Sequence, residues 1–477
     1  MTFLYVTAAI VALLWVTLFV VRGSLVGGCL AFLIAGACFG YYFLSFDLGP
    51  IPLTIDRLVL AILLAMFVIH WRRGQLGAGP LGTGPLGTGP LGTGPLERVD
   101  VLLLVFIVLL TVSTILNLSP GAMPKLAKPW TRLLGAYVIP AVLYFIARAA
   151  PTGRRGISLF QGALVCLGVY LAATGLLEIT QQWWAVFPKH ITDPDSGIHF
   201  GRARGPMVQA VSYGSYVGVC LLAAWVWQWR FDNKGRLLLM ALLPLLAAAA
   251  FFTYTRSAWL GIALGMTIVL GLTLRGVWRP LVLGTIVSVG LLLAVTKMDK
   301  LIEFDRGENV AHARSSVDLR GDFAYLSWKM FLDRPLLGVG FDQFRNAKLP
   351  YLADRSSEFK MEYLRHYSHH NTLLSLLTET GLVGLSLFLA VLGGWGWIAW
   401  KLARSREMPD WARAQGALLL GALGIYISQA AFHELSYTAI DNVLIFTLAG
   451  LTVGLHAELT GKTPAGNTPA VETNGTA

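Results

Sequence analysis

Histidine and arginine side chains stand at the edges of long apolar runs in this sequence, and they are the residues best suited to chemistry. His369 and His370 are followed by Asn371 and then directly by an apolar segment of transmembrane length. A histidine titrates near neutral pH and can accept a proton from a hydroxyl group. Arg256 lies between two apolar runs, where ionisable residues are costly and tend to mark function. These residues predict a site at the membrane edge that activates a hydroxyl beside an anion.

Two further arginines, Arg202 and Arg204, lie in the segment Gly-Arg-Ala-Arg-Gly-Pro. The planar guanidinium group makes paired, charge-assisted hydrogen bonds to phosphate and keeps its proton. Arg256 together with Arg204 therefore suits a diphosphate, and which of the two loop arginines contributes stays open. The alternatives are that Arg256 extends to lipid headgroups and that Arg204 is an ordinary solvated charge.

The adjacent histidines point in different directions from the start of a helix, so we expect only one of His369 and His370 to act as a base. For either of them, the alternative is a helix-capping or interfacial role. His366 stands four residues before His370, a spacing that can bind metal on a helix. No third ligand stands at a matching spacing, and we therefore expect neither a metal nor another cofactor.

The composition is that of a membrane protein. Of the 477 residues, 55% are hydrophobic and 13% are charged, against about 25% charged in soluble domains. Apolar runs of about 20 residues recur, long enough to cross a hydrocarbon core about 30 Å thick. Because these runs are unbroken, they indicate helices and not barrel strands. The sequence predicts an all-α, polytopic membrane protein with about twelve or thirteen spans, near residues 3–21, 24–44, 51–70, 100–117, 131–149, 157–176, 211–229, 236–252, 257–273, 280–296, 372–400, 414–432 and 438–456.

The charges of the connecting loops predict an orientation. The net charge is +11, and the excess lies in short loops after odd-numbered spans, which the positive-inside rule places in the cytoplasm. We therefore expect no nucleic-acid partner. The loops after even-numbered spans then share the outer face, including the loop near residues 177–210, the turn at Arg256 and the large loop 297–370. The four cysteines all lie in apolar segments, which predicts core packing and not a disulfide or metal set.

The predicted organisation follows from these spans. Within the large outer loop we expect an amphipathic helix over residues 318–332 and a tight turn at residues 338–340. Residues 77–96 contain a Gly-Thr-Gly-Pro-Leu repeat, which is typical of a flexible linker. The predicted segments are N-terminal membrane helices (1–76), a cytoplasmic linker (77–98), membrane helices with an outer loop near 177–210 (99–296), the large loop (297–370), C-terminal membrane helices (371–458) and a disordered tail (459–477).

Four motifs together resemble the O-antigen ligase and polymerase family. Residues 255–261 read Thr-Arg-Ser-Ala-Trp-Leu-Gly, and residues 333–341 read Asp-Arg-Pro-Leu-Leu-Gly-Val-Gly-Phe. Residues 370–374 read His-Asn-Thr-Leu-Leu, and residues 379–385 read Glu-Thr-Gly-Leu-Val-Gly-Leu. The resemblance covers roughly residues 200–460 in order and spacing.

The resemblance implies a multi-pass inner-membrane glycosyltransferase of the GT-C type with its active face in the periplasm. It implies a glycan donor on undecaprenyl diphosphate, an acceptor hydroxyl on lipid A-core or on another glycan, and inverting transfer without a metal. His370 would be the base, and Arg256 and Arg204 would hold the diphosphate. Arg202, His369 and Asn371 would lie in the substrate site beside them.

Three alternatives stay open. A polymerase of O-antigen or exopolysaccharide shares the scaffold, as does a transferase that moves oligosaccharides to protein hydroxyls. A lipid or solute transporter would also explain many spans and arginines near the membrane edge. A transporter predicts an internal repeat or broken helices at the midplane, and the sequence has no clear repeat.

Overall fold

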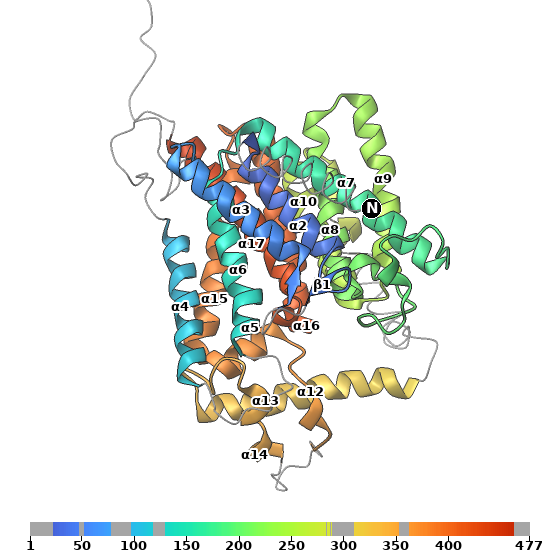
Figure 1. The fold of residues 1–477 in the computed structure, drawn as a ribbon. Coiled ribbons are helices and arrows are strands. Elements are labelled where there is room, and N and C mark those ends of the chain that lie inside the picture. Colours follow the sequence, from blue (N-terminus) through green and yellow to red (C-terminus); the bar gives the residue numbers. More distant parts are fainter. Residues whose placement is uncertain are drawn as a thin grey trace, which may run out of the picture.

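The computed structural model describes residues 22–46, 52–77, 97–117, 129–288 without 283 and 287, 310–352 and 362–461. Within these ranges the protein is built almost entirely of helices (Figure 1). The β-structure found there is one antiparallel hairpin, in which β1 (Ser45–Phe46) pairs with β2 (Leu53–Thr54). The predicted all-α membrane fold is confirmed.

Nine helices of the described residues are long and apolar enough to cross a membrane. Helices satisfy their own backbone hydrogen bonds, which a lipid-exposed chain must do. These nine are α4 (Arg98–Leu116), Pro129–Ala149 (α5 Pro129–Leu133, π-helix η1 Leu134–Val138, α6 Ile139–Ala149), α7 (Gly153–Ile179), Ala210–Arg230 (α8 Ala210–Val226, η4 Trp227–Arg230), α9 (Asn233–Phe251), α10 (Arg256–Thr273), α15 (Thr372–Arg404), α16 (Asp410–Phe432) and α17 (Ala439–Gly461).

The other four predicted spans are not among these nine helices. Two of them are helices α2 (Leu25–Cys38) and α3 (Ile55–Arg72), the first only 14 residues long and the second carrying several charges. The predicted span 3–21 and most of 280–296 fall outside the described residues, as do almost all of the 77–96 repeat and the tail after residue 461. Cys166 departs from the predicted core packing because it is exposed, whereas Cys29, Cys38 and Cys220 are buried, and all four are free thiols.

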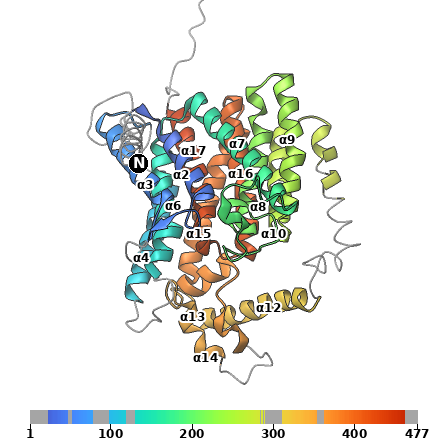
Figure 2. The ribbon, with the colours of Figure 1, turned by 45° about the vertical axis from the view of Figure 1, so that its right-hand side comes forward.

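The predicted outer connections meet at one end of the bundle. The backbone of Ala203 donates to the carbonyl of Phe252 over 2.9 Å, and Thr372 donates to the carbonyl of His433 over 3.1 Å. Helix α12 (Val310–Asp333) runs across this end, which we call the α12 end (Figures 1 and 2). The predicted amphipathic helix in the large loop is confirmed and is longer than expected. Short elements complete this end: η2 (Lys189–Thr192), η3 (Gly205–Met207), α13 (Phe344–Ala347), α14 (Leu349–Leu352), η5 (Glu362–His366) and η6 (Leu435–Tyr437).

The opposite end of the bundle gathers the basic connections, and we call it the basic end. There Arg148 pairs with Asp100 over 2.8 Å, and the guanidinium of Arg154 lies over the ring of Trp229. The separation of the two sets of loops agrees with the alternation that the loop charges predict.

Helices α10 and α16 pack backbone to backbone. A Cβ atom added to Gly265 would lie 2.6 Å from the carbonyl oxygen of Gly421, so only a residue without a side chain fits there. Small residues permit such close approach in membrane helices, where packing drives association. This contact holds the start of α10 beside the end of α16, and both ends carry residues of the candidate site.

Candidate active site

Two polar side chains meet where α10 begins and α16 ends. The Oγ of Ser257 lies 2.8 Å from Nε2 of His433, the residue directly after α16. The hydroxyl of Ser428 also donates to the carbonyl of Ser257 over 3.1 Å. Because Arg256 is the first residue of α10, these contacts fix the backbone that carries it at the α12 end.

His433 belongs to a cluster of basic residues drawn from several segments. Burial lowers the pKa of His433 to about 3, and the nearby charges of Arg320, His199 and His370 act in the same direction. These residues come from α12, from the loop after α7 and from the segment before α15. His433 therefore stays neutral near pH 7 and can exchange a hydrogen bond with Ser257.

His370 lies at the surface of this cluster, two residues before α15 begins. Its ring meets that of Phe323 edge to face, with 5.6 Å between the centroids. Protein atoms around part of the ring reduce its hydration, which lowers the pKa of His370, and the nearby charge of Arg320 lowers it further. An exposed, neutral imidazole that is held in place by contact with an aromatic ring is suited to accept a proton from a bound hydroxyl.

His369 points the other way, into the protein. Only 3% of its surface is exposed, and its ring packs on Phe344 with 3.5 Å between centroids. Among the described residues, neither ring nitrogen of His369 has a hydrogen-bond partner. Burial, with the charges of Arg132, Lys348 and His370, holds the pKa of His369 well below its ordinary value. The adjacent histidines thus have different surroundings, as their positions at the start of a helix predict.

Asn371 is the N-cap of α15. Its side-chain oxygen accepts from the backbone of Leu374 over 3.0 Å, and its Nδ2 donates to the carbonyl of Ala431 over 2.7 Å. An N-cap satisfies backbone donors that the first helical turn leaves unpaired. Asn371 therefore fixes the start of α15 against the end of α16, and His370 with it.

Arg204 is buried and bound by protein. None of its surface is exposed, and its Nε lies 3.1 Å from Glu178 Oε1. Its other nitrogens donate to the carbonyls of Ile191, Asp193 and Ser196. This guanidinium joins the end of α7 to the following loop, which leaves little of its fork for a diphosphate. Arg202 and Arg256 are half-buried.

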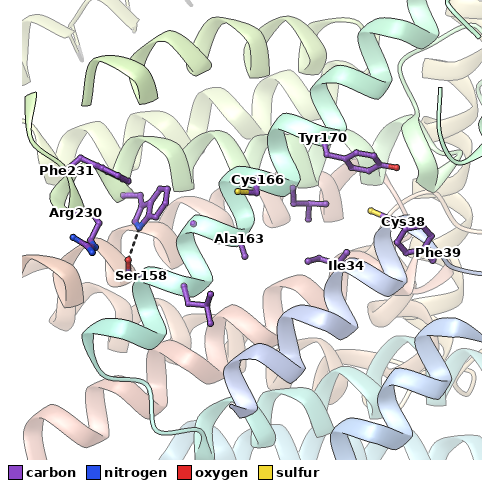
Figure 3. A pocket seen from close by; sticks show the side chains of 13 residues that line it. Ile34, Cys38, Phe39, Ser158, Ala163, Cys166, Tyr170, Arg230 and Phe231 are labelled. Atoms are coloured by element: carbon purple, nitrogen blue, oxygen red, sulfur yellow. Dashed lines mark hydrogen bonds between the residues drawn. The ribbon is translucent and has the colours of Figure 1, made fainter. Parts of the chain in front are cut away.

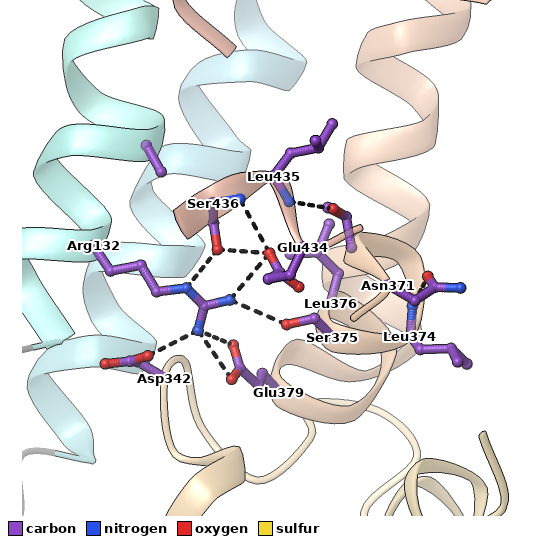
Figure 4. Close-up of polar contacts among 12 residues, drawn as sticks. Arg132, Asp342, Asn371, Leu374, Ser375, Leu376, Glu379, Glu434, Leu435 and Ser436 are labelled. Atoms are coloured by element: carbon purple, nitrogen blue, oxygen red, sulfur yellow. Dashed lines mark hydrogen bonds and ion pairs between the residues drawn. The ribbon is translucent and has the colours of Figure 1, made fainter. Parts of the chain in front are cut away.

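A second buried arginine ties the two histidine-bearing segments together (Figure 4). Arg132 of α5 lies 2.9 Å from Glu379 and 3.4 Å from Glu434, and it also donates to Asp342 over 2.9 Å. Glu379 belongs to the helix that follows His370, and Glu434 follows His433 directly. The serines at positions 375 and 436 accept two further hydrogen bonds from the same guanidinium. Arg132 is therefore a positioning residue for both segments.

Three of these residues were not predicted from the sequence: Arg132, Arg320 and His433. Arg132 lies inside a predicted span, and a charge within an apolar run is a usable signal. His433 directly follows the predicted span 414–432, and a histidine at the edge of an apolar run is a weaker signal of the same kind. Arg320 stands among many charges in the large loop, and no pattern in the sequence separates it from them.

A comparison with known families bears on this arrangement. Residues 241–389 match the family model described as O-antigen ligase. This segment belongs to the O-antigen ligase family. No curated protein gives a significant match to the chain. The family resemblance of the four motifs is confirmed for this segment. The match to this family supports a glycan-transfer function of the O-antigen ligase or polymerase type.

The segment matched to the O-antigen ligase family contains two motifs that hydrogen-bond to each other. The backbone of Val339 donates to the carbonyl of Thr378 over 3.0 Å, and that of Leu382 donates to the carbonyl of Pro335 over 2.8 Å. Gly381 interrupts α15 with φ 67°, a conformation that favours glycine. The predicted tight turn is confirmed, since Gly338 and Gly340 also have positive φ. The pairing holds the large loop against the part of α15 that follows His370 in the chain.

Proposed function

We propose that this protein transfers a glycan from undecaprenyl diphosphate to a hydroxyl of lipid A-core at the periplasmic face of the inner membrane. The observation that carries the proposal is the convergence of His370, Arg320 and the Ser257–His433 pair beside Arg256. One exposed neutral imidazole and two nearby guanidinium groups match what a hydroxyl acceptor and a diphosphate leaving group require.

In the proposed reaction His370 takes the proton of the acceptor hydroxyl. The acceptor oxygen forms a bond to the anomeric carbon from the side opposite the diphosphate, which inverts the configuration. The bond between that carbon and the diphosphate oxygen breaks, and its electron pair leaves with the diphosphate. Fixed guanidinium groups stabilise the charge that develops there, and we assign this role to Arg256 with Arg320 beside it. The step as written needs no metal ion.

The remaining predicted site residues receive more specific proposals. We assign Arg204 a positioning role, because its donors are used by Glu178 and by backbone carbonyls. We assign His369 a packing role and Asn371 a capping role, both of which fix the backbone of His370. Arg202 stays proposed as a contact to the donor or the acceptor.

A transfer assay with purified protein, in which the donor is combined with each acceptor in turn, tests the proposal. We expect transfer from an undecaprenyl-diphosphate-linked glycan to lipid A-core in the presence of EDTA. Chain growth from the donor alone would make the protein a polymerase, and glycan on an added acceptor protein would make it a protein transferase. Movement of the donor across vesicles without any covalent product would overturn the proposal in favour of a transporter.

A further inference from the structure

A groove of about 830 Å³ lies along α7 (Figure 3), and its lining contains none of the residues of the candidate active site. Helix α2 borders it on one side, and residues of η4 close one end. Cys166 and Ala163 lie near its middle, Tyr170 and Phe39 at one end and Arg230 at the other (Figure 3). Because its central residues lie in the middle of a 27-residue span, the groove lies at the depth of the hydrocarbon core.

The groove offers an occupant little hydrogen bonding. The hydroxyl of Tyr170 already donates to the carbonyl of Phe187 over 2.7 Å, and that of Ser158 accepts from Trp227 over 3.3 Å. The other central lining residues are aliphatic, aromatic or cysteine. A sugar would lose its hydration there without replacement, whereas an alkyl chain would lose nothing. The chemistry of the lining therefore selects a lipid chain.

Charge is found at one end of the groove. Arg230 lines it there and is exposed. Arg154 is exposed close by, and its guanidinium lies over the ring of Trp229 at 5.6 Å. Arginines beside a groove between membrane helices are suited to the phosphate of an anionic lipid. An occupant with an apolar chain and an anionic head is therefore complementary to the groove along its length.

We propose that the groove binds one anionic phospholipid, with an acyl chain along α7 and the phosphate beside Arg230 and Arg154. This ligand is distinct from the glycan donor. Arg230 follows the end of α8 at the basic end, whereas Arg256 and His370 lie at the α12 end. A glycan donor whose diphosphate lay beside Arg256 could not also place that diphosphate beside Arg230, because the two arginines lie at opposite ends of the bundle. The inference therefore stands independently of the proposed reaction.

Native mass spectrometry of the full chain in detergent tests the site. We expect phosphatidylglycerol to bind at least several-fold more tightly than phosphatidylcholine with the same acyl chains. The Arg154→Gln/Arg230→Gln variant should lose about 30-fold in affinity for phosphatidylglycerol, since each such arginine contributes about 1 kcal/mol and 1.4 kcal/mol corresponds to a factor of ten. Arg404→Gln/Arg406→Gln is the matched control, because Arg404 also lies exposed over a tryptophan, Trp400, and it should bind like wild type.

Cys166 gives a second readout that does not depend on folding of the arginine variant. It is the exposed thiol of the four, so an apolar maleimide should label it in delipidated protein. Added phosphatidylglycerol should slow that labelling more than phosphatidylcholine does. Equal affinity for the two lipids would overturn the proposal. Cys166 that stays unreactive in delipidated protein would also overturn it, because the groove would then be closed to an added lipid chain.

Discussion

The Oγ of Ser257 lies 2.8 Å from Nε2 of His433 and joins the first turn of α10 to the loop after α16. The two residues are 176 positions apart in the chain. Arg256 precedes Ser257, and the cluster of His370 and Arg320 lies beside His433. One hydrogen bond thus links the arginine proposed to hold the diphosphate to the segment that neighbours the proposed base.

Replacement of Ser257 by alanine tests that link. The change leaves the buried imidazole of His433 without this partner, which costs about 1–2 kcal/mol. We expect kcat/KM for glycan transfer to fall about tenfold with membrane insertion unchanged. Ser386→Ala is the control, because that hydroxyl donates only to a carbonyl of its own helix. Equal activity of the two variants would show that the Ser257 contact has no part in transfer.

Replacement of Arg256 by lysine separates charge from geometry. Lysine keeps the positive charge but lacks the planar fork that binds a diphosphate at two points. We expect kcat to fall by about tenfold to 100-fold, which is less than the loss of a whole stabilising group because lysine keeps the charge. Arg365→Lys, at an exposed position of η5, should have wild-type kcat. A wild-type kcat for Arg256→Lys would show that this arginine does not bind the diphosphate and would favour a contact with lipid headgroups.

The pH profile of transfer tests the base. Both the surrounding protein and Arg320 lower the pKa of His370, so the neutral form persists at pH values below the ordinary histidine pKa. The acidic limb of kcat/KM should therefore lie below pH 6.5. Removal of a positive charge in Arg320→Gln should raise the pKa of His370 and move this limb to higher pH. A limb that does not move in this variant would argue against His370 as the titrating group.

Replacement of Gly381 by alanine tests the paired motifs. A Cβ atom at this position would lie 2.2 Å from the carbonyl oxygen of Leu336, and the backbone conformation at φ 67° and ψ −165° costs an alanine about 1–3 kcal/mol more. We expect a lower thermal midpoint of unfolding and weak transfer. Gly393→Ala lies in the same helix with nothing within 4 Å and should be neutral or stabilising. If both variants melt like wild type, the pairing of the loop with α15 does not need the glycine.

Membrane helices, and the grouping of their connections at two ends of the bundle, could be predicted because long apolar runs and loop charges encode them directly. The exposed position of His370 before α15 follows from the same pattern. The kink at Gly381 could not be predicted from α15 alone, since its cause is the backbone of residues 335–339, which lie far away in sequence.

Arg204 shows why a residue type alone does not define a site. Its sequence neighbours suggest an exposed loop arginine, but the fold brings Glu178 and three carbonyls around it. Arg132 shows the converse, because its carboxylate partners come from three separate segments. Pairings across such distances depend on tertiary packing, which no local pattern contains.

The most direct test of the account compares His370→Ala with His366→Ala in the purified transfer assay. His366 is exposed in the same loop, four residues earlier, and has no role in the proposed reaction. Because general base catalysis contributes about 100-fold or more, His370→Ala should lose at least that factor in kcat while His366→Ala keeps wild-type kcat. Transfer by His370→Ala within a few-fold of wild type would contradict the central claim that this histidine deprotonates the acceptor.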